Sequence, residues 1–146
     1  MLLFLDVDGV LLGKTNKNDV RHCLAASCEE FIDFSLEHFD CYWLTSHCKG
    51  DAETVLDYLR PYASPQLLEK LMEIKPTTYK TFKTEALFGD FIWIDDSPTM
   101  YEINYLEQSN LLNRWLQVNT RKDYHALEKL MPDISAITQQ IKSTYK

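Results

Sequence analysis

The chain begins with MLLFLDVDGVLLG, residues 1–13, and this stretch decides the expected fold. Residues 2–6 form an apolar run that ends in a carboxylate, which is typical of a strand covered on both faces of a parallel sheet. Asp6, Asp8 and Gly9 stand at the end of this strand. Two carboxylates so close together repel each other, and burying either is costly unless a partner compensates its charge. A functional site would explain that cost.

The rest of the chain alternates predicted strands with predicted helices. Three further buried strands are expected, namely CYWLTS at 41–46, FIWID at 91–95 and RWLQVN at 114–119. Helices are expected at 25–38, at 51–60, from Ser64–Pro65, near 84–88, from Ser97–Pro98 and at 123–131, where Pro132 ends the helix. Residues 74–84 look irregular. This alternation predicts an α/β fold, a Rossmann-like three-layer sandwich with a mainly parallel sheet.

The length and composition suit one globular domain. The chain has 146 residues, of which 45% are hydrophobic and 25% charged. We expect a single domain over 1–146, with a core to about 131 and a helical tail over about 132–146. The intervals 8–45 and 45–83 are too short for a separate cap domain, so the cleft should be open. Alternatively, residues 61–82 form a small lid.

The charge and the cysteines exclude several classes of protein. A formal net charge of −7 without a basic stripe argues against non-specific nucleic-acid binding. No apolar run is long enough to span a membrane, and no basic leader precedes Asp6, so a cytoplasmic location is expected. The four cysteines form no CxxC pair. A zinc site from the nearby cysteines and histidines matches no familiar ligand spacing (Cys23, Cys28, His22 and His47).

Polar residues follow three of the predicted strands. They are Asp6 with Asp8, Thr45 with Ser46, and Asp95 with Asp96. Each cluster alone has a structural interpretation, as an Asp-Gly turn, a strand end or a helix cap. Together they converge on the carboxyl edge of one sheet, where open parallel sheets bind ligands. Mg²⁺ is the expected cofactor, because it prefers oxygen ligands and is usually held by carboxylates together with a substrate phosphate.

The motifs LDVDGVL, LTS, a later lysine and WIDDSP resemble those of the haloacid dehalogenase-like superfamily of phosphatases and phosphotransferases, in particular its small members without a cap. The resemblance implies that Asp6 is the nucleophile and forms an aspartyl-phosphate. It implies that Asp8 is the general acid and base. Mg²⁺ would be bound by the carboxylate of Asp6, by the backbone carbonyl of Asp8 and by Asp96. Asp95 would orient a metal-bound water, or exchange roles with Asp96.

The resemblance also implies how the phosphate is bound. Thr45 would donate a hydrogen bond to a phosphate oxygen, helped by the backbone N–H of Ser46. Gly9 would let the backbone turn beneath the metal, and His47 follows LTS closely enough to touch the substrate. A lysine would neutralise the remaining charge. Lys83, at the start of the predicted short helix, is preferred, and Lys80 and Lys75 stay open as alternatives.

The expected function is therefore that of a Mg²⁺-dependent phosphatase acting on a phosphorylated small molecule or a macromolecular end. A phosphotransferase of the same fold and a catalytically silent phosphate- or metal-binding module are alternatives. A receiver-type signalling domain is disfavoured, because there the adjacent acidic pair follows the first strand, whereas here Asp95 and Asp96 follow a later one.

Overall fold

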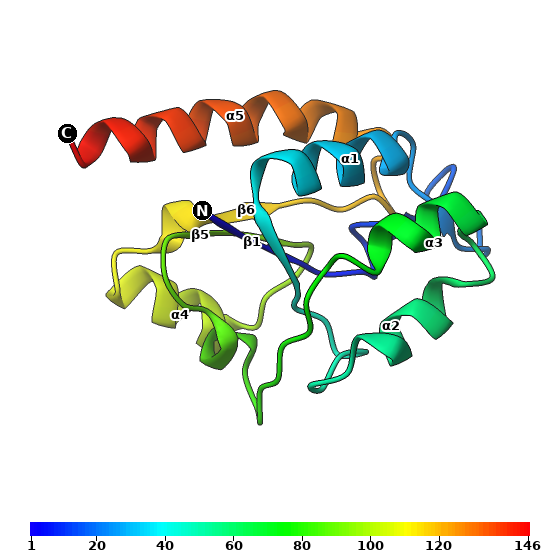
Figure 1. Cartoon of the computed structure of the whole chain (residues 1–146), viewed down its shortest axis with the longest axis horizontal. Coiled ribbons are helices and arrows are strands. Elements are labelled where there is room, and N and C mark those ends of the chain that lie inside the picture. The colour runs from blue at the N-terminus through cyan, green and yellow to red at the C-terminus, as the bar shows by residue number, and fades with distance from the viewer.

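A four-stranded sheet forms the centre of the protein, as the computed structural model of residues 1–146 shows (Figure 1). Its strands, in the order β4-β1-β5-β6, are all parallel. Their bounds are Leu2–Leu5 for β1, Asp40–Trp43 for β4, Phe91–Asp95 for β5 and Trp115–Gln117 for β6. The predicted α/β fold with a parallel sheet is confirmed.

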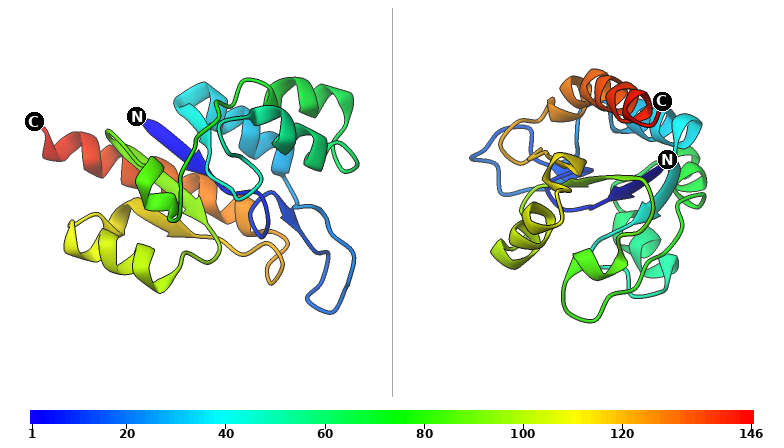
Figure 2. Two further views of the ribbon diagram at one scale, coloured as in Figure 1. Left: turned by 90° about the horizontal axis from the view of Figure 1, so that it is seen from below. Right: turned by 90° about the vertical axis from the view of Figure 1, so that its left-hand side faces the viewer.

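Helices cover both faces of the sheet. The helices are α1 (Cys28–His38), α2 (Ala52–Leu59), α3 (Pro65–Leu71), α4 (Met100–Gln108) and α5 (Ala126–Thr144), with 3₁₀ turns η1 (Lys83–Ala86) and η2 (Leu112–Arg114). In the end-on view of Figure 2, α1 and α5 lie above the sheet and α4 lies below it. No helix is both long enough and apolar enough to cross a membrane.

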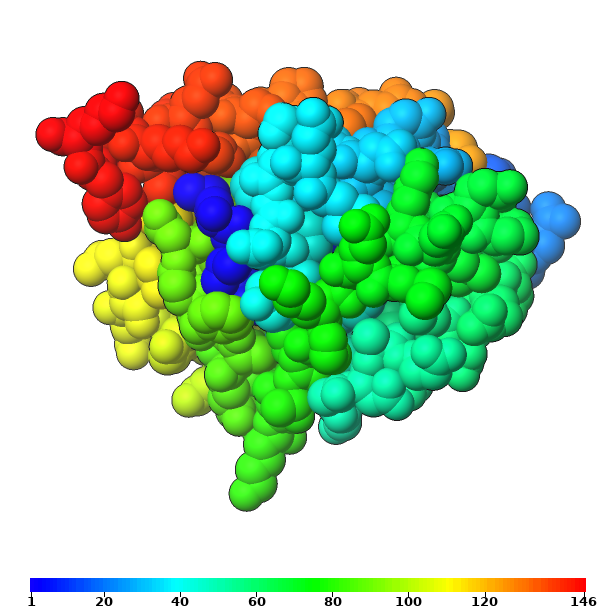
Figure 3. All heavy atoms as spheres, in the orientation of Figure 1, coloured from blue at the N-terminus to red at the C-terminus, as the bar shows by residue number.

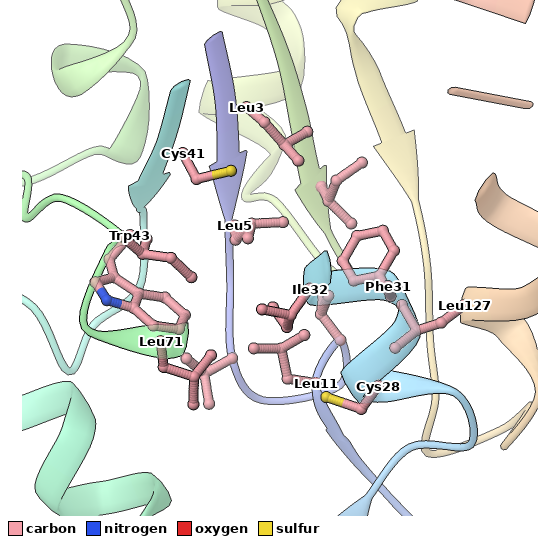
Figure 4. Close-up of a cluster of buried hydrophobic side chains, with 14 of the residues drawn as sticks. Leu3, Leu5, Leu11, Cys28, Phe31, Ile32, Cys41, Trp43, Leu71 and Leu127 are labelled. Carbon is pink, nitrogen blue, oxygen red and sulfur yellow. The ribbon is translucent and has the colours of Figure 1, made fainter. Parts of the chain in front are cut away.

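The core divides according to the alternation of side chains along β1. Leu3 and Leu5 belong to a cluster of 25 buried residues, whereas Phe4 belongs to a cluster of 5 on the opposite face. Figure 4 shows Leu3 and Leu5 gathered with Phe31 of α1 and Leu127 of α5. Each fully buried side chain of this size contributes about 2 kcal/mol to folding. The apolar stretch 2–5 therefore anchors the sheet between the two helical layers.

The region between α2 and β5 does not form the lid that is one expectation for residues 61–82. Leu67 and Leu71 of α3 are buried in the larger cluster, so α3 is part of the core. Ile74 and Thr77 are buried and Lys75 pairs with Tyr42 of β4, so residues 74–77 pack against the edge of the sheet. The green chain near residue 80 is the lowest part of the molecule in Figure 3. It leads directly into η1, which begins at Lys83.

Several elements differ from the prediction. Residues 12–24 contain a small antiparallel hairpin of β2 (Leu12–Gly13) and β3 (Cys23–Leu24), which no pattern in the sequence predicts. Helix α4 begins at Met100, and its cap is Thr99 instead of Ser97. The reason is a capping box, in which the side chains of Thr99 and Glu102 each accept a backbone N–H of the other.

The predicted helix end at Pro132 is wrong, because α5 runs through Pro132 without a break. A proline inside a helix removes one hydrogen bond and costs about 3 kcal/mol. Leu127, Leu130, Ile134 and Ile141 lie at helical spacing and are all buried. Their burial on both sides of the proline outweighs its cost, so the expected division between core and tail falls inside one helix.

Candidate functional site

The register of the sheet brings three of the predicted motifs to one edge. Leu5 of β1 lies level with Trp43 of β4 and with Ile94 of β5. Asp6 directly follows Leu5, and its N–H donates to the carbonyl oxygen of Ile94 at 3.1 Å. Because β1 lies between β4 and β5, Asp6 stands between the motif that contains Thr45 and the motif that contains Asp95.

Three carboxylates meet at this edge. Ligand atoms of Asp6, Asp95 and Asp96 all lie within 4.8 Å of one another, and Asp6 and Asp95 are buried. Lys83 is the cation in contact with this group, with its Nζ 2.6 Å from Asp95 Oδ2 and 3.2 Å from Asp6 Oδ2. One ammonium group cannot compensate three carboxylates, so the cluster keeps an excess of negative charge.

The pKa values reflect this excess. Burial, together with the charge of Asp95, raises the pKa of Asp6 to about 7, against the opposing effect of Lys83. Burial and Asp95 also raise the pKa of Asp96. Burial alone would lower the pKa of Lys83, but Asp6 and Asp95 outweigh it and raise that pKa above its usual value. Ionising all three carboxylates is unfavourable unless further positive charge arrives.

The donor set fits a hard divalent cation. Carboxylate oxygens are the ligands that Mg²⁺ prefers. Both carboxylate oxygens of Asp95 already accept hydrogen bonds, from Lys83 and from the N–H of Ser97, whereas the carboxylate of Asp96 accepts none from another residue. The backbone carbonyl of Asp8 also accepts no hydrogen bond. Asp6, Asp96 and the carbonyl of Asp8 are therefore the groups suited to hold Mg²⁺, with Asp95 occupied by the lysine.

Asp6 determines how the stability of the metal-free protein should depend on pH. Its pKa is about 7 in the folded protein against an ordinary value of 3.8, so folding favours its protonated form. The corresponding stability is fully present below about pH 4 and is lost as pH rises through 7. In EDTA, urea unfolding should show the free energy of unfolding of the wild type falling between about pH 4 and 7 relative to Asp6→Asn. Parallel pH profiles of the two proteins would contradict this.

Asp8 lies outside the three-carboxylate group and has its own partners. The Tyr58 hydroxyl donates to Asp8 Oδ1 at 2.6 Å, and His47 Nε2 lies 2.7 Å from Asp8 Oδ2. The rings of His47 and Tyr58 stack with centroids 3.8 Å apart. Burial alone would raise the pKa of Asp8, but the hydrogen bonds from Tyr58 and His47 outweigh it and lower that pKa. The two rings therefore hold Asp8 in one orientation.

Thr45 and Ser46 offer hydrogen-bond donors beside Asp6. Thr45 is buried, and its Oγ1 accepts the N–H of His47 at 3.3 Å, which leaves its O–H free to donate. Ser46 is exposed, and its N–H donates to no protein group. These two donors are the groups that a phosphate oxygen would need at this position.

The three candidate lysines occupy different places. Lys83 contacts Asp6 and Asp95, as described above. Lys75 lies 3.7 Å from Asp40, which begins β4, and so belongs to the opposite edge of the sheet. Lys80 is exposed, in the stretch of chain that leads into η1. Of the three, Lys83 alone has its ammonium group at the carboxylate cluster.

Gly9 shapes the site through its backbone. Its φ is +76°, and a Cβ added there would lie 2.3 Å from Asp96 Oδ2. Its N–H donates to the carbonyl of Leu12, and its carbonyl accepts the N–H of Thr120, both at 2.8 Å. Glycine is required here because Asp96 packs directly against the backbone.

Gly9→Ala should destabilise the protein by about 1–3 kcal/mol and should weaken Mg²⁺ binding, because it strains the backbone and displaces Asp96. Gly50→Ala is the matched control: Gly50 has a φ of +80°, but an added Cβ would meet nothing closer than 3.9 Å. Urea unfolding and calorimetric titration with Mg²⁺ measure both effects. Equal Mg²⁺ affinity in the two variants would show that the contact with Asp96 is unimportant.

Sequence reasoning missed Arg121 and gave no specific role to Tyr58. Arg121 Nη2 lies 3.9 Å from Asp8 Oδ1. A signal for Arg121 was present, since it follows the predicted strand 114–119 and so falls at the same edge of the sheet as Asp6. Tyr58 lies on α2, and the rule that ligands bind at the carboxyl ends of the strands does not identify a residue on a helix.

The site is open on one side. The exposed fraction of the side chain rises from 9% for Asp6 through 17% for Lys83 and 28% for Asp8 to 38% for Arg121. A cavity of about 470 Å³ lies elsewhere, between the chain after β6 and α5, and none of the predicted carboxylates lines it. A ligand at Asp6 would therefore extend outward past Asp8.

No protein-family model, curated protein or solved structure matches the chain. The resemblance to haloacid dehalogenase-like proteins thus depends on the motifs LDVDGVL, LTS and WIDDSP. The distances and hydrogen bonds of the site are independent of that resemblance.

Proposed function

We propose that the protein is a Mg²⁺-dependent phosphatase of the haloacid dehalogenase-like type, which transfers a phosphoryl group to Asp6 and then to water. One observation carries the proposal. Asp6 is a buried carboxylate at the end of the central strand, in contact with Lys83 and within 4.8 Å of Asp95 and Asp96. A carboxylate in such a cluster is suited both to bind a divalent cation and to attack a phosphorus atom.

Several protein groups contribute to the first step, the transfer of the phosphoryl group to Asp6. A carboxylate oxygen of Asp6 attacks phosphorus, and the bond from phosphorus to the leaving oxygen breaks. Lys83, the O–H of Thr45 and the N–H of Ser46 stabilise the charge on the non-bridging oxygens. Mg²⁺, held by Asp6, Asp96 and the carbonyl of Asp8, supplies further charge neutralisation when bound. Asp95 holds the ammonium group of Lys83 in position at 2.6 Å.

Asp8 is the general acid of the first step and the general base of the second. Tyr58 and His47 keep Asp8 ionised in the structure, so it must first take up a proton from solvent. It then donates this proton to the leaving oxygen, and in the second step it takes a proton from the water that attacks the aspartyl-phosphate. Both of its carboxylate oxygens are engaged, by Tyr58 and by His47, in the structure. One of these contacts must open before Asp8 can reach a leaving oxygen, and that rearrangement belongs to the proposed catalytic cycle.

The test is an assay with p-nitrophenyl phosphate and a panel of phosphomonoesters, with Mg²⁺ or with EDTA. We expect turnover that needs Mg²⁺, and a rapidly quenched reaction should contain a peptide with Asp6 heavier by one phosphoryl group. Turnover that survives EDTA, or a phosphoryl group on another residue, would overturn the proposal. Transfer to an added alcohol in preference to water would identify a phosphotransferase instead. Phosphate binding without turnover of any panel member would identify a silent module.

A further inference from the structure

We propose that Arg121 binds a second anionic group of the substrate, a phosphate or a carboxylate, on the leaving-group side of Asp6. This inference rests on the proposed function, because it takes Asp8 as the group that protonates the leaving oxygen. It names a substrate class: phosphomonoesters whose leaving group itself carries a negative charge.

The backbone around Arg121 is firmly held. The N–H of Thr120, a fully buried residue, donates to the carbonyl of Gly9 at 2.8 Å, and its hydroxyl donates to the carbonyl of Leu12 at 3.2 Å. The N–H of Arg121 donates to Asn119 Oδ1 at 3.1 Å. The start of the Arg121 side chain is thus fixed relative to the loop that contains Asp8.

The guanidinium group of Arg121 donates no hydrogen bond within the protein. Its closest carboxylate oxygen, Asp8 Oδ1, lies 3.9 Å from Nη2, beyond hydrogen-bond distance, and already accepts the hydroxyl of Tyr58. Its Nε is buried and makes no hydrogen bond. The side chain is nevertheless 38% exposed, and none of its N–H groups donates a hydrogen bond within the protein. The exposed part of the guanidinium group is therefore free to bind an incoming anion.

The position of Arg121 assigns it to the leaving group and not to the transferred phosphate. Lys83 contacts Asp6, and Thr45 and Ser46 follow the strand next to the one that ends at Asp6, whereas Arg121 lies 3.9 Å from Asp8. Its side chain is also the more exposed, at 38% against 17% for Lys83. A guanidinium group can hold two oxygens of one phosphate or carboxylate at once, which suits recognition of such a group.

The experiment compares matched substrates in matched variants. The pairs are adenosine 3′-monophosphate with adenosine 3′,5′-bisphosphate, and glycerol 3-phosphate with 3-phosphoglycerate, which add a phosphate and a carboxylate respectively. The variants are Arg121→Gln and, as a control that removes one positive charge from the adjacent exposed position, Lys122→Gln. Arg121→Gln should lower kcat/KM roughly 10- to 100-fold for the doubly anionic member of at least one pair, and far less for its partner. Lys122→Gln should leave the preference unchanged.

The result separates the inference from the proposed function. An equal loss on both members of each pair would mean that Arg121 acts only through Asp8, and would overturn the inference while the phosphatase stands. Binding of the four compounds to Asp6→Asn, measured by calorimetry with Mg²⁺, does not depend on turnover. A preference for the doubly anionic compounds that disappears in Asp6→Asn/Arg121→Gln would support the second-anion site even if no compound is hydrolysed. Binding that ignores Arg121 would contradict it.

Discussion

Replacing Asp6 with asparagine is expected to lower kcat roughly 10⁴-fold or more. The amide has nearly the same shape as the carboxylate but is a poor nucleophile, so the aspartyl-phosphate cannot form. The fold should survive, because the change removes one charge from a crowded group of three carboxylates. The measurement is turnover of p-nitrophenyl phosphate with Mg²⁺, combined with thermal unfolding in EDTA at about pH 8.

The control for this variant is Asp133→Asn, which changes an exposed residue of α5. It should retain the turnover and the unfolding temperature of the wild type. An Asp6→Asn protein that is folded and still active would remove Asp6 from the mechanism. A loss of activity together with a lower unfolding temperature would instead show that Asp6 is needed for the fold, contrary to the pKa of about 7 that burial gives it.

Replacing Lys83 with methionine should affect both activity and stability. Methionine keeps much of the aliphatic length but leaves Asp6 and Asp95 without their shared cation. Removing one partner from a buried ion pair costs about 3–5 kcal/mol, and we expect about 3 kcal/mol at pH 8. Turnover should fall roughly 10³-fold, because a preorganised charge that stabilises the transition state is lost. Urea unfolding and p-nitrophenyl phosphate turnover measure the two effects.

Lys75→Met and Lys80→Met are the matched controls for this variant. Lys75 pairs with Asp40 at the opposite edge of the sheet, and Lys80 is exposed, so both should keep nearly full activity and stability. A double variant, Asp6→Asn/Lys83→Met, should be less destabilised than the sum of its single changes, since the unpaired carboxylate at position 6 is gone. Strict additivity would mean that Lys83 and Asp6 do not interact in solution.

Much of the fold could be predicted from local patterns. The apolar stretches at 2–5 and 91–95 are strands because they are buried on both sides, and Asp51 and Ser64 cap α2 and α3 as their side chains favour. The hairpin of β2 and β3 could not be predicted, since each strand has two residues and too short a pattern. The path of α5 through Pro132 depends on burial against distant residues, which outweighs the local signal.

The site could be predicted in part for the same reason. Asp6, Thr45 and Asp95 each stand at the end of an apolar stretch that the sequence shows to be a strand. Because the carboxyl ends of parallel strands meet at one edge of the sheet, their positions could be predicted. The choice among Lys83, Lys80 and Lys75 depends on how segment 73–82 folds back, and no periodicity encodes that path. The contact of Tyr58 with Asp8 joins a helix to a loop 50 positions away in the chain, and only tertiary packing creates it.

The hydrogen bond between Thr120 and Gly9 has a consequence for folding during synthesis. During synthesis the loop that contains Asp8 and Gly9 leaves the ribosome early. Thr120, whose N–H donates to the carbonyl of Gly9, emerges only after β6. A Cβ on Gly13 would also lie 2.4 Å from the carbonyl oxygen of Thr120, so the two segments meet without space between them. A nascent chain released before residue 120 would carry every acidic residue of the centre but would lack the hydrogen bond that holds Gly9.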